Sequence, residues 1–416
     1  MLNERRKVDL ECKPLIQLNS AEFWKATITL SVSSFFIFAS LHMVQPLLPL
    51  FSKEFGVSPT TASLAVSLVT LTLSISLVIF GILSDTFGRK NIMSMGLMAS
   101  SILSITIFFV PDFSTLLILR ALQGIFLASL PAVALAYIGE EYDKAAIGLA
   151  IGIYISGNSL GGMGGRIVSG FISDHWGWQY SFLFIGAVGI ISFFLFLFYL
   201  PSCKNFKQRP FSIRTLLHSF DHYKNPILRL AFYIGGILLF IFIGSFNYLG
   251  YHLHKAPFNL STTVIGLIYI SYLSGTFSST LSGRLDNRLN SSERILLGFA
   301  VILVGLILMI IPNLIMIFLG LLIFVFGFFF AHSAASSWVS HYALSSKASA
   351  SGLYLLTYYI GGSFGSTSLG FIYEPFGWMG VSFVTIFMVL IGLGIGTKMY
   401  FIEKRINAKN TENATQ

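Results

Sequence analysis

Two arginines lie inside long apolar stretches of the chain, where a charged group needs a partner. Arg166 lies in ISGNSLGGMGGRIVSG (155–170), and Arg120 lies in LILRALQGIFLA (117–128). A guanidinium among apolar groups in a bilayer costs at least about 2.5–3.5 kcal/mol, so it should face protein or water and have a function. Both arginines are therefore candidates for a substrate cavity. The alternative for Arg166 is a structural role, tied to helix-end carbonyls or to Asp174.

The small and polar residues around Arg166 are spaced as on a helix. At 100° per residue, Asn158, Gly162 and Arg166 share one polar face. The neighbouring face carries glycines at the same spacing: Gly157, Gly161 and Gly165. The pattern predicts close packing of a partner helix on the glycine face. It also predicts that Asn158 lines the cavity and that the glycines make room for the Arg166 side chain.

Other polar side chains could share this cavity. Gln45 and His42, near the end of the first apolar stretch, should lie at the depth of the two arginines. Histidine titrates near neutral pH, so His42 and His332 are proton-coupling candidates, with a structural hydrogen bond as the alternative for each. Three residues of the second half are candidate substrate contacts, with ordinary packing as the alternative: Asn247, Tyr354 and Tyr358.

The elements that position these residues must be membrane helices. The chain has 416 residues, of which 55% are hydrophobic and 10% charged. A bilayer core requires roughly 20 apolar residues per helix, and twelve such spans are predicted. They are 26–50, 60–83, 91–110, 113–138, 146–172, 178–200, 227–250, 262–283, 295–312, 313–339, 348–372 and 378–401. The predicted fold class is an all-α integral membrane protein.

The basic residues predict the orientation. Most of the 26 Lys and Arg flank the spans on the side of the termini, whereas Lys53 and Lys255 fall on the opposite side. Cytoplasmic loops carry the excess of basic residues. Both termini should therefore be cytoplasmic and the protein a multi-pass protein of the cytoplasmic (inner) membrane. The net charge of +9 is explained by this topology and by attraction to anionic lipid, not by nucleic acid.

The second half of the sequence repeats the first. GFISDHWGW (170–178) matches GFIYEPFGW (370–378) at an offset of 200. The chain divides into an N-terminal segment (1–25), a six-helix bundle (26–200), a linker (201–226), a second six-helix bundle (227–401) and a tail (402–416). Two parallel halves around a central cavity are a transporter architecture.

Three motifs resemble the major facilitator superfamily. GILSDTFGRK (81–90) resembles its loop between helices 2 and 3. LILRALQGIFLA looks like its helix 4 motif in the proton-coupled, drug-antiporter branch, and this resemblance makes Arg120 a candidate for proton coupling. GNSLGG (157–162) resembles the helix 5 antiporter motif, with Asn158 in place of the usual proline. YISGNSLGGMGGR (154–166) and FFFAHSAASSW (328–338) are similar to a subgroup of inner-membrane transport proteins.

The resemblance also implies a conformational latch on the side of the termini. Asp85 would contact the start of helix 11, around Ser349 and Ser351, while Arg89 would pair with an acidic residue below helix 4, Glu140 first among them. Gly81 and Gly88 complete the motif. The latch would hold the state that is open on the opposite side.

The leading hypothesis is a secondary transporter, a monomer that exports small amphipathic or aromatic compounds in exchange for protons by alternating access. Because the spans hold two arginines and no central carboxylate, the alternative is a transporter of small organic anions or sugars. A membrane receptor or enzyme is the remote alternative, because no nucleotide-binding loop, HExxH pair or nucleophile elbow is present. No cofactor or metal is predicted.

Overall fold

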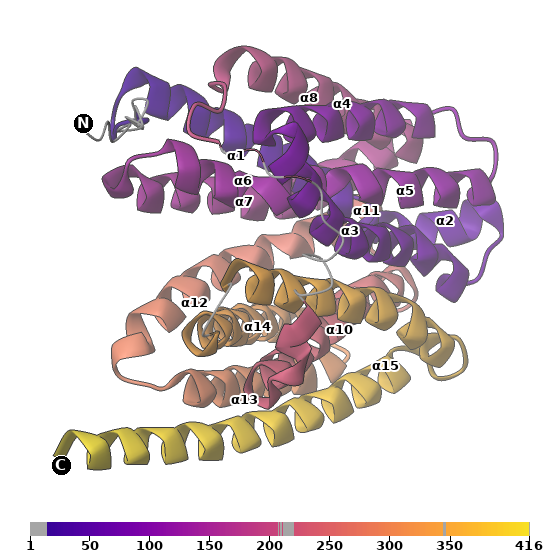
Figure 1. Cartoon of the computed structure of the whole chain (residues 1–416). Coiled ribbons are helices and arrows are strands. Elements are labelled where there is room, and N and C mark those ends of the chain that lie inside the picture. The colour runs from indigo at the N-terminus through magenta and orange to yellow at the C-terminus, as the bar shows by residue number, and fades with distance from the viewer. Residues whose placement is uncertain (1–14, 207, 209, 211–219, 344–346, 416) are drawn as a thin grey trace, which may run out of the picture.

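The computed structural model describes residues 15–206, 208, 210, 220–343 and 347–415, and these residues are almost entirely helical (Figure 1). The first half contains α1 (Ala21–His42), η1 (Gln45–Leu47), α2 (Leu48–Phe55), α3 (Pro59–Phe87), α4 (Arg89–Ile107), α5 (Phe113–Leu127), α6 (Ser129–Glu141), α7 (Lys144–Trp176) and α8 (Trp178–Tyr199). The second half contains η2 (Phe220–Lys224), α10 (Pro226–His254), α11 (Thr262–Leu267), η3 (Ile268–Ser271), α12 (Tyr272–Arg284), η4 (Leu285–Asn287), α13 (Ser291–Ile310), α14 (Leu314–Tyr342) and α15 (Lys347–Thr415). Much of the predicted N-terminal segment (1–14) and of the predicted linker (207, 209, 211–219) lies outside the described residues.

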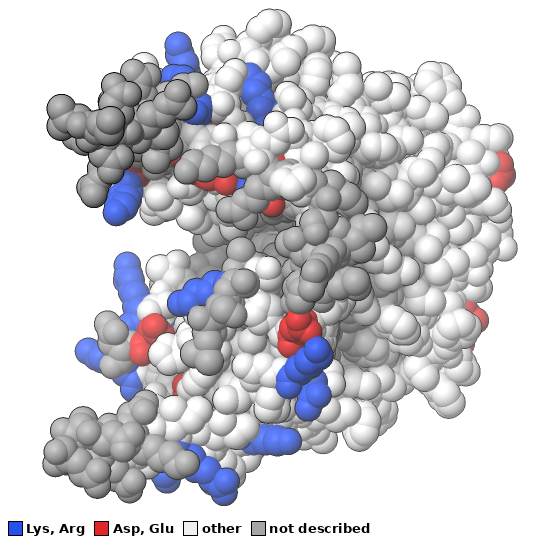
Figure 2. All heavy atoms as spheres, viewed as in Figure 1, with Lys and Arg blue, Asp and Glu red and all other residues white. Residues whose placement is uncertain are grey.

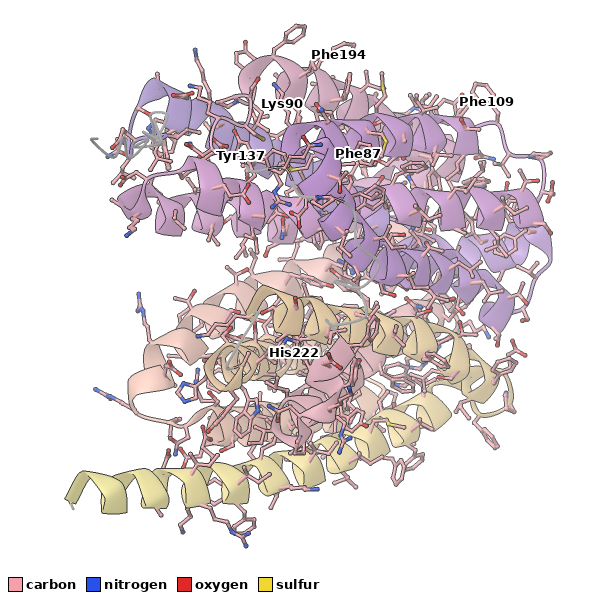
Figure 3. The ribbon with its side chains drawn as sticks, in the orientation of Figure 1. Phe87, Lys90, Phe109, Tyr137, Phe194 and His222 are labelled. Carbon is pink, nitrogen blue, oxygen red and sulfur yellow. The ribbon has the colours of Figure 1, made fainter. Side chains whose placement is uncertain are left out.

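The described helices have the length and surface of membrane helices. Ten stretches among them are long and apolar enough to cross a bilayer, and the last of these, Ser349–Ala408, holds two helices joined at a kink. Large apolar side chains point away from the molecule, as Phe109 and Phe194 do in Figure 3. Phe109 is 73% exposed and Phe194 is 47% exposed. An apolar outer surface of this kind is stable only against lipid. The prediction of an all-helical membrane fold is confirmed.

Proline and glycine explain where the long helices break. Pro46 and Pro49 follow the end of α1, and the chain makes the short turn η1 before α2 begins. Pro131 lacks the N–H that would bond to the carbonyl of Leu127, which is the last residue of α5. Gly377 has φ +58° inside α15 and separates the two helices there. The breaks near Pro46 and Pro131 lie inside stretches that hydropathy alone predicts as single spans. The break at Gly377 lies between two predicted spans.

The helices form two bundles, α1–α8 and α10–α15, as Figure 1 shows. Glycines set the packing within each bundle in the same way. A Cβ atom at Gly165 of α7 would lie 2.5 Å from Cα of Ala39 in α1, and one at Gly161 would clash with the backbone of Phe35. Gly361 and Gly365 of α15 pack equally tightly on the backbone of α10. The predicted glycine face is thus where the first helix of each bundle packs.

The two ends of the molecule differ. The start of α1 and the end of α15 lie on one side, which we call the terminal side, and Lys and Arg side chains gather there (Figures 1 and 2). On that side the visible surface is hollowed between the two bundles, and on the opposite side the bundles meet without a gap (Figure 2). We call this opposite side, where α2 ends and α3 begins, the closed side.

The last helix continues beyond the predicted final span. The span ends at residue 401, whereas α15 extends to Thr415. Glu403 is 7% exposed and accepts hydrogen bonds from the backbone N–H (3.1 Å) and the hydroxyl (2.5 Å) of Ser292, at the start of α13. This contact holds the helix beside the second bundle after its apolar sequence has ended, so hydropathy cannot predict the extension.

Candidate functional site between the two bundles

A chain of buried polar side chains crosses from one bundle to the other. Arg166 Nε of α7 donates to Gln45 Oε1 (2.6 Å), and Gln45 Nε2 donates to Asn247 Oδ1 of α10 (2.7 Å). Asn247 Nδ2 donates to the Ser366 hydroxyl of α15 (2.8 Å), which itself donates to the backbone carbonyl of Ser63 in α3 (3.1 Å). These five residues, which we call the polar layer, join α3, α7, α10, α15 and the turn η1, and so both bundles. Three of them, Arg166, Gln45 and Asn247, are predicted cavity residues.

The helix break after α1 places Gln45 in this layer. Gln45 is the first residue of η1 and is followed by Pro46, so the regular α-helical stretch of α1 has ended before this point. Its side chain is 1% exposed and both of its amide atoms have partners. A buried amide that is satisfied on both sides fixes the orientation of its neighbours. Gln45 thereby links Arg166 to the second bundle.

Arg166 is fully buried but incompletely paired. Its Nη1 donates to the carbonyl of Gly162 (2.6 Å), one turn earlier in α7, while its Nη2 has no hydrogen-bond partner in the described chain. The guanidinium carbon lies 4.5 Å from the ring centre of Tyr269 and 4.8 Å from that of Tyr272, both from the second bundle. A cation over aromatic faces is attracted by their quadrupoles. Among the described residues, no carboxylate forms an ion pair with Arg166.

Two expectations about Arg166 need correction. Asp174 is not its partner, because that carboxylate accepts from the backbone of Thr262 and Thr263 instead. The glycines of α7 do not chiefly make room for the arginine. A Cβ at Gly162 would lie 3.5 Å from Arg166 Nη1, which is an ordinary contact, whereas Gly157, Gly161 and Gly165 face α1.

Arg120 lies inside the first bundle rather than between the bundles. Its guanidinium donates to the backbone carbonyls of Ser40 (2.9 Å) and Leu41 (3.0 Å) at the end of α1, and to that of Ala65 in α3 (3.2 Å). It also donates to the side chain of Gln123, one turn later in α5. Arg120 is 0% exposed and every guanidinium nitrogen has an acceptor. In this state it ties α1, α3 and α5 together.

Aromatic side chains of the second bundle surround His332. The Tyr354 hydroxyl lies 2.8 Å from His332 Nδ1, and the ring of Tyr358 lies 4.7 Å from the imidazole. Phe328, one turn before His332 in α14, stacks on Phe242 of α10 at 3.8 Å. Phe242 in turn contacts Tyr272, on which Arg166 lies. We call this set the aromatic wall: Phe242, Tyr272, Phe328, His332, Tyr354 and Tyr358.

Two further predicted residues lie on the first bundle. His42 is half-buried, its Nδ1 has no partner in the described chain, and its Cδ2 would lie 3.6 Å from a Cβ at Gly162, so it is close to Arg166. Asn158 is half-buried on α7 and accepts a hydrogen bond from the Ser34 hydroxyl of α1. Both side chains contact α1 or α7, so neither belongs to the aromatic wall.

The motif between α3 and α4 forms a charged cluster on the terminal side. Arg89 lies 2.8 Å from Glu140 at the end of α6 and 2.5 Å from Asp85 at the end of α3. Gly88 has φ +92°, which only glycine adopts readily, and it allows the sharp turn that Phe87 and Lys90 flank in Figure 3. A Cβ at Gly81 would meet no described atom within 4 Å. Asp85 is paired with Arg89 in this state, and its contact with Ser349 or Ser351 stays a prediction.

Two carboxylates that bridge the bundles were not predicted. Asp174 of α7 binds the start of α11, and Glu374 of α15 binds the start of α3. The signal was present, because GFISD and GFIYE put both acids at the same place in the repeat. Sequence alone does not say that each lies against a helix of the other bundle. Arg294, which is buried against Asp286 in the second bundle, is a further buried charge that the sequence patterns do not indicate.

Comparisons with known proteins agree with this architecture. A model described as Major Facilitator Superfamily matches residues 30–366. The inner membrane transport protein YnfM of Escherichia coli is 36% identical over 92% of this chain and 93% of its own length. The multidrug resistance protein MdtG of Klebsiella pneumoniae is 27% identical over 73% of this chain and 76% of its own. A bacterial homologue of the human lysosomal transporter Spinster, solved in an inward-facing, unoccupied conformation, has a TM-score of 0.75 at 16% identity and covers 93% of this chain and 98% of that one.

Proposed function

The chain belongs to the major facilitator superfamily of membrane transporters, and on that premise we propose that it exports small amphipathic or aromatic compounds in exchange for protons by alternating access. The observation that carries the proposal is the difference between the two ends of the same helix pairs. At the closed side, α3 meets α15 and α7 meets α11 across the interface between the bundles. At the terminal side the surface is hollowed between the bundles (Figure 2).

Glycines support a second arrangement of these helices. At the closed side, a Cβ at Gly170 of α7 would lie 2.6 Å from the carbonyl oxygen of Thr262, and one at Gly370 of α15 would lie 2.8 Å from Cα of Thr60. Small residues facing open space are what a helix partner needs in order to approach closely. On the terminal half of the same helices, a Cβ atom would meet no described atom within 4 Å at Gly81, Gly148, Gly152, Gly283 and Gly352. Closing the terminal side would bury these glycines.

The terminal side would be cytoplasmic. Basic residues gather there, in accord with the positive-inside rule, and the relative YnfM is an inner membrane protein (Figure 2). The protein would then lie in the cytoplasmic membrane with both termini inside, open to the cytoplasm in this state. One chain supplies both bundles, so the transporter would work as a monomer within lipid.

The aromatic wall is the proposed substrate surface. It combines aromatic faces with the hydroxyls of Tyr354 and Tyr358 and the imidazole of His332, and a planar compound could stack on it. Tyr358 and His332 are half-buried, which leaves part of each side chain open to a ligand. A relative with multidrug resistance in its name is consistent with a loosely specific surface of this kind.

His332 is the proposed proton-coupling group. It lies within the wall, so a bound cation and a proton on the imidazole would repel one another, which is the basis of exchange. Arg166, at the far end of the wall beside Tyr272, would keep the site from retaining cations. His42 is the second candidate, and Arg120 would contribute only by holding α1 and α3 in place.

The charged cluster at Arg89 would stabilise the state that is closed on the terminal side. When the terminal side closes, Asp85 would be released from Arg89 and would bind the start of the α15 helix, while Arg89 keeps Glu140. The partly exposed Asp85 carboxylate and the open space beside Gly81 are consistent with a missing partner helix in this state.

One observation favours a second candidate function, transport of small organic anions. Among the described residues, the buried Nη2 of Arg166 has no hydrogen-bond partner and no carboxylate neutralises the charge of this side chain. A carboxylate-bearing substrate that reached the polar layer would supply the missing acceptor. The aromatic wall would then hold the apolar part of the same molecule.

Transport into inside-out vesicles separates these functions. Vesicles with a respiration-driven proton gradient would receive an acridine dye or radiolabelled benzoate. Wild type would be compared with His332→Gln, Arg166→Gln and the matched control His341→Gln. His341 is an exposed histidine on the same helix as His332. Dye uptake that stops with a protonophore and in His332→Gln, but not in His341→Gln, is the expected result. Benzoate movement that requires Arg166, without dye movement, would overturn the drug-export proposal in favour of the anion transporter.

A further inference from the structure

Asp174 joins the first bundle to the second through backbone hydrogen bonds. Its Oδ1 accepts from the N–H of Thr262 (3.2 Å) and its Oδ2 from the N–H of Thr263 (2.7 Å). These are the first two residues of the helical stretch Thr262–Arg284, which begins with α11. Both N–H groups lie in the first turn, where a helix has no internal acceptors for them. Asp174 therefore caps a helix that belongs to the other bundle.

Glu374 makes the reciprocal contact. Its Oε1 accepts from the N–H of Thr60 (3.1 Å), the second residue of α3. Glu374 is on the second bundle and α3 is on the first, so the direction of the contact is reversed. The two acids stand at equivalent places in the repeat, GFISD at 170–174 and GFIYE at 370–374. The pseudo-symmetry of the fold therefore produces two such caps across one interface.

Each helix start also has its own cap, so neither acid is needed simply to begin the helix. The Ser261 hydroxyl accepts from Val264 N–H (3.3 Å), and the Ser58 hydroxyl accepts from Thr61 N–H (3.2 Å). The acids satisfy other N–H groups of the first turn, and their negative charge lies at the positive end of the helix dipole.

Close packing brings the acids within reach. Gly170 precedes Asp174 by one turn and lies against the Thr262 carbonyl, while Gly370 precedes Glu374 by one turn and lies against Thr60. A side chain at either glycine would push the bundles apart and lengthen the hydrogen bonds of the acids. Glycine and acid, one turn apart on one helix, thus form a docking unit for the start of the partner helix.

We propose that Asp174 and Glu374 are a symmetric pair of latches that hold the closed side shut, and that both contacts break whenever this side opens. Each hydrogen bond joins a residue of one bundle to a residue of the other, so neither can survive their separation. The latches stabilise the state open on the terminal side, and the cluster around Arg89 has no part in them. Asp174 and Glu374 are positioning residues that contact no substrate.

Accessibility of a buried reporter tests the latches without any transport assay. In a background with Cys12→Ser and Cys203→Ser, Ser63→Cys places a thiol on α3, where Ser63 is 0% exposed. A bulky membrane-impermeant maleimide is applied to intact cells and, separately, to inside-out vesicles. If the terminal side is cytoplasmic, labelling in cells reports opening of the closed side. If the orientation is reversed, labelling in the inside-out vesicles reports opening of the closed side.

The comparison uses Asp174→Asn, Glu374→Gln, the double variant and the matched control Asp112→Asn. Asp112 also caps a helix on the closed side, accepting from Thr115 N–H (2.9 Å), but that helix, α5, belongs to its own bundle. We expect each latch variant to raise the labelling rate by about twofold to fivefold, as the strength of a carboxylate at a helix start implies. The double variant should exceed both, and Asp112→Asn should leave the rate unchanged.

A purely structural role predicts a different result. If the contacts were only structural, their loss would lower the melting temperature of the purified variants without changing the labelling rate. Asp112→Asn would then behave like the latch variants. An unchanged rate in the folded double variant would overturn the latches. If the latch variants raise the labelling rate but the protein moves neither dye nor benzoate, the latch proposal stands and the proposed substrates are wrong. The two proposals can therefore fail separately.

Discussion

Gln45 and Asn247 lie on different bundles and share a buried hydrogen bond of 2.7 Å between the Gln45 amide nitrogen and Asn247 Oδ1. Because Gln45 also accepts from Arg166 and Asn247 donates to Ser366, this bond is the central link of the polar layer. Separating the bundles on the closed side must break it. Under the proposed alternating access, the energy of this link would therefore contribute to the balance between the two states of the transporter.

A double-mutant cycle measures that link. We expect Gln45→Leu and Asn247→Leu each to lower the thermal stability of the purified protein, because each leaves a buried amide without its partner. The double variant should be less destabilised than the sum of the two, with a coupling of about 1 kcal/mol. Additive effects would show that the two amides act independently. The thermal midpoint of the monodisperse protein is the measurement.

Arg120 should be required for folding rather than for substrate choice. Its guanidinium binds the backbone of α1 and α3 at three carbonyls, and the single ammonium of a lysine cannot reproduce that planar arrangement of donors. Arg120→Lys is therefore expected to cost on the order of 3 kcal/mol, because two or more charged hydrogen bonds are lost. Size-exclusion profiles after heating would reveal the loss. A stable Arg120→Lys protein with altered substrate preference would instead place Arg120 in the cavity.

Two glycines should respond to substitution in opposite ways, because Gly161 packs on α1 within the first bundle whereas Gly352 lies beside open space. Gly161→Val is expected to lower the yield of folded protein, because its side chain would meet the Phe35 backbone in every state. Gly352→Val has open space here and should fold normally, yet it should stop transport by preventing closure of the terminal side. Thermal stability and dye uptake, measured on both variants, distinguish the two effects. Normal transport by Gly352→Val would show that α15 does not close against α3.

The Arg89 cluster should favour the state that is closed on the terminal side. Glu140→Gln removes the partner that holds Arg89 at 2.8 Å, and Asp85→Asn removes the charge that would reach the start of the α15 helix. We expect both variants to slow transport by roughly tenfold, equivalent to about 1.4 kcal/mol, while binding of dye to the open terminal side is retained. Equilibrium binding and initial uptake rates are measured together. Loss of binding in parallel with uptake would indicate general misfolding.

Cys203 should react slowly with thiol reagents at neutral pH. It lies after α8, outside the membrane helices, and burial raises the pKa of its thiol above the ordinary value. Because the thiolate is the reactive form, alkylation should accelerate only as the pH rises through this raised pKa. The neutral thiol is favoured in the folded protein, so its contribution to stability is lost at high pH. A pH series of maleimide labelling in a Cys12→Ser protein, with the unfolded protein as reference, checks the shift.

Much of the fold was predictable because the bilayer imposes a simple pattern. Apolar stretches of span length gave the helices, and the repeat GFISD and GFIYE gave the two bundles. The helix breaks were harder to predict, because a hydropathy plot does not include the effect of Pro46 or Pro131 on backbone hydrogen bonds. The extension of α15 depends on one side-chain contact of Glu403, and no periodicity contains that information.

Counting along the sequence predicts how deep each site residue lies along its helix, but not toward which neighbouring helix its side chain points. Counting residues from the helix ends placed Arg120, Arg166 and Gln45 at one level, and both arginines do contact the end of α1 or the turn at Gln45 that follows it. Which arginine faces the other bundle depends on how α5 and α7 are rotated, and a rotation is fixed only by packing. The bridging acids Asp174 and Glu374 depend on contacts between bundles, which lie far apart in sequence.

The last helix has a practical consequence for imaging and for measuring motion. From the kink at Gly377 to Thr415 the chain is helical, and Glu403 attaches this helix to the start of α13. A rigid domain fused in helical register after this segment would move as one body with the second bundle. Such a fusion would give the two helical bundles an asymmetric marker for particle alignment. The angle between that marker and a probe on the first bundle would follow the transport cycle directly.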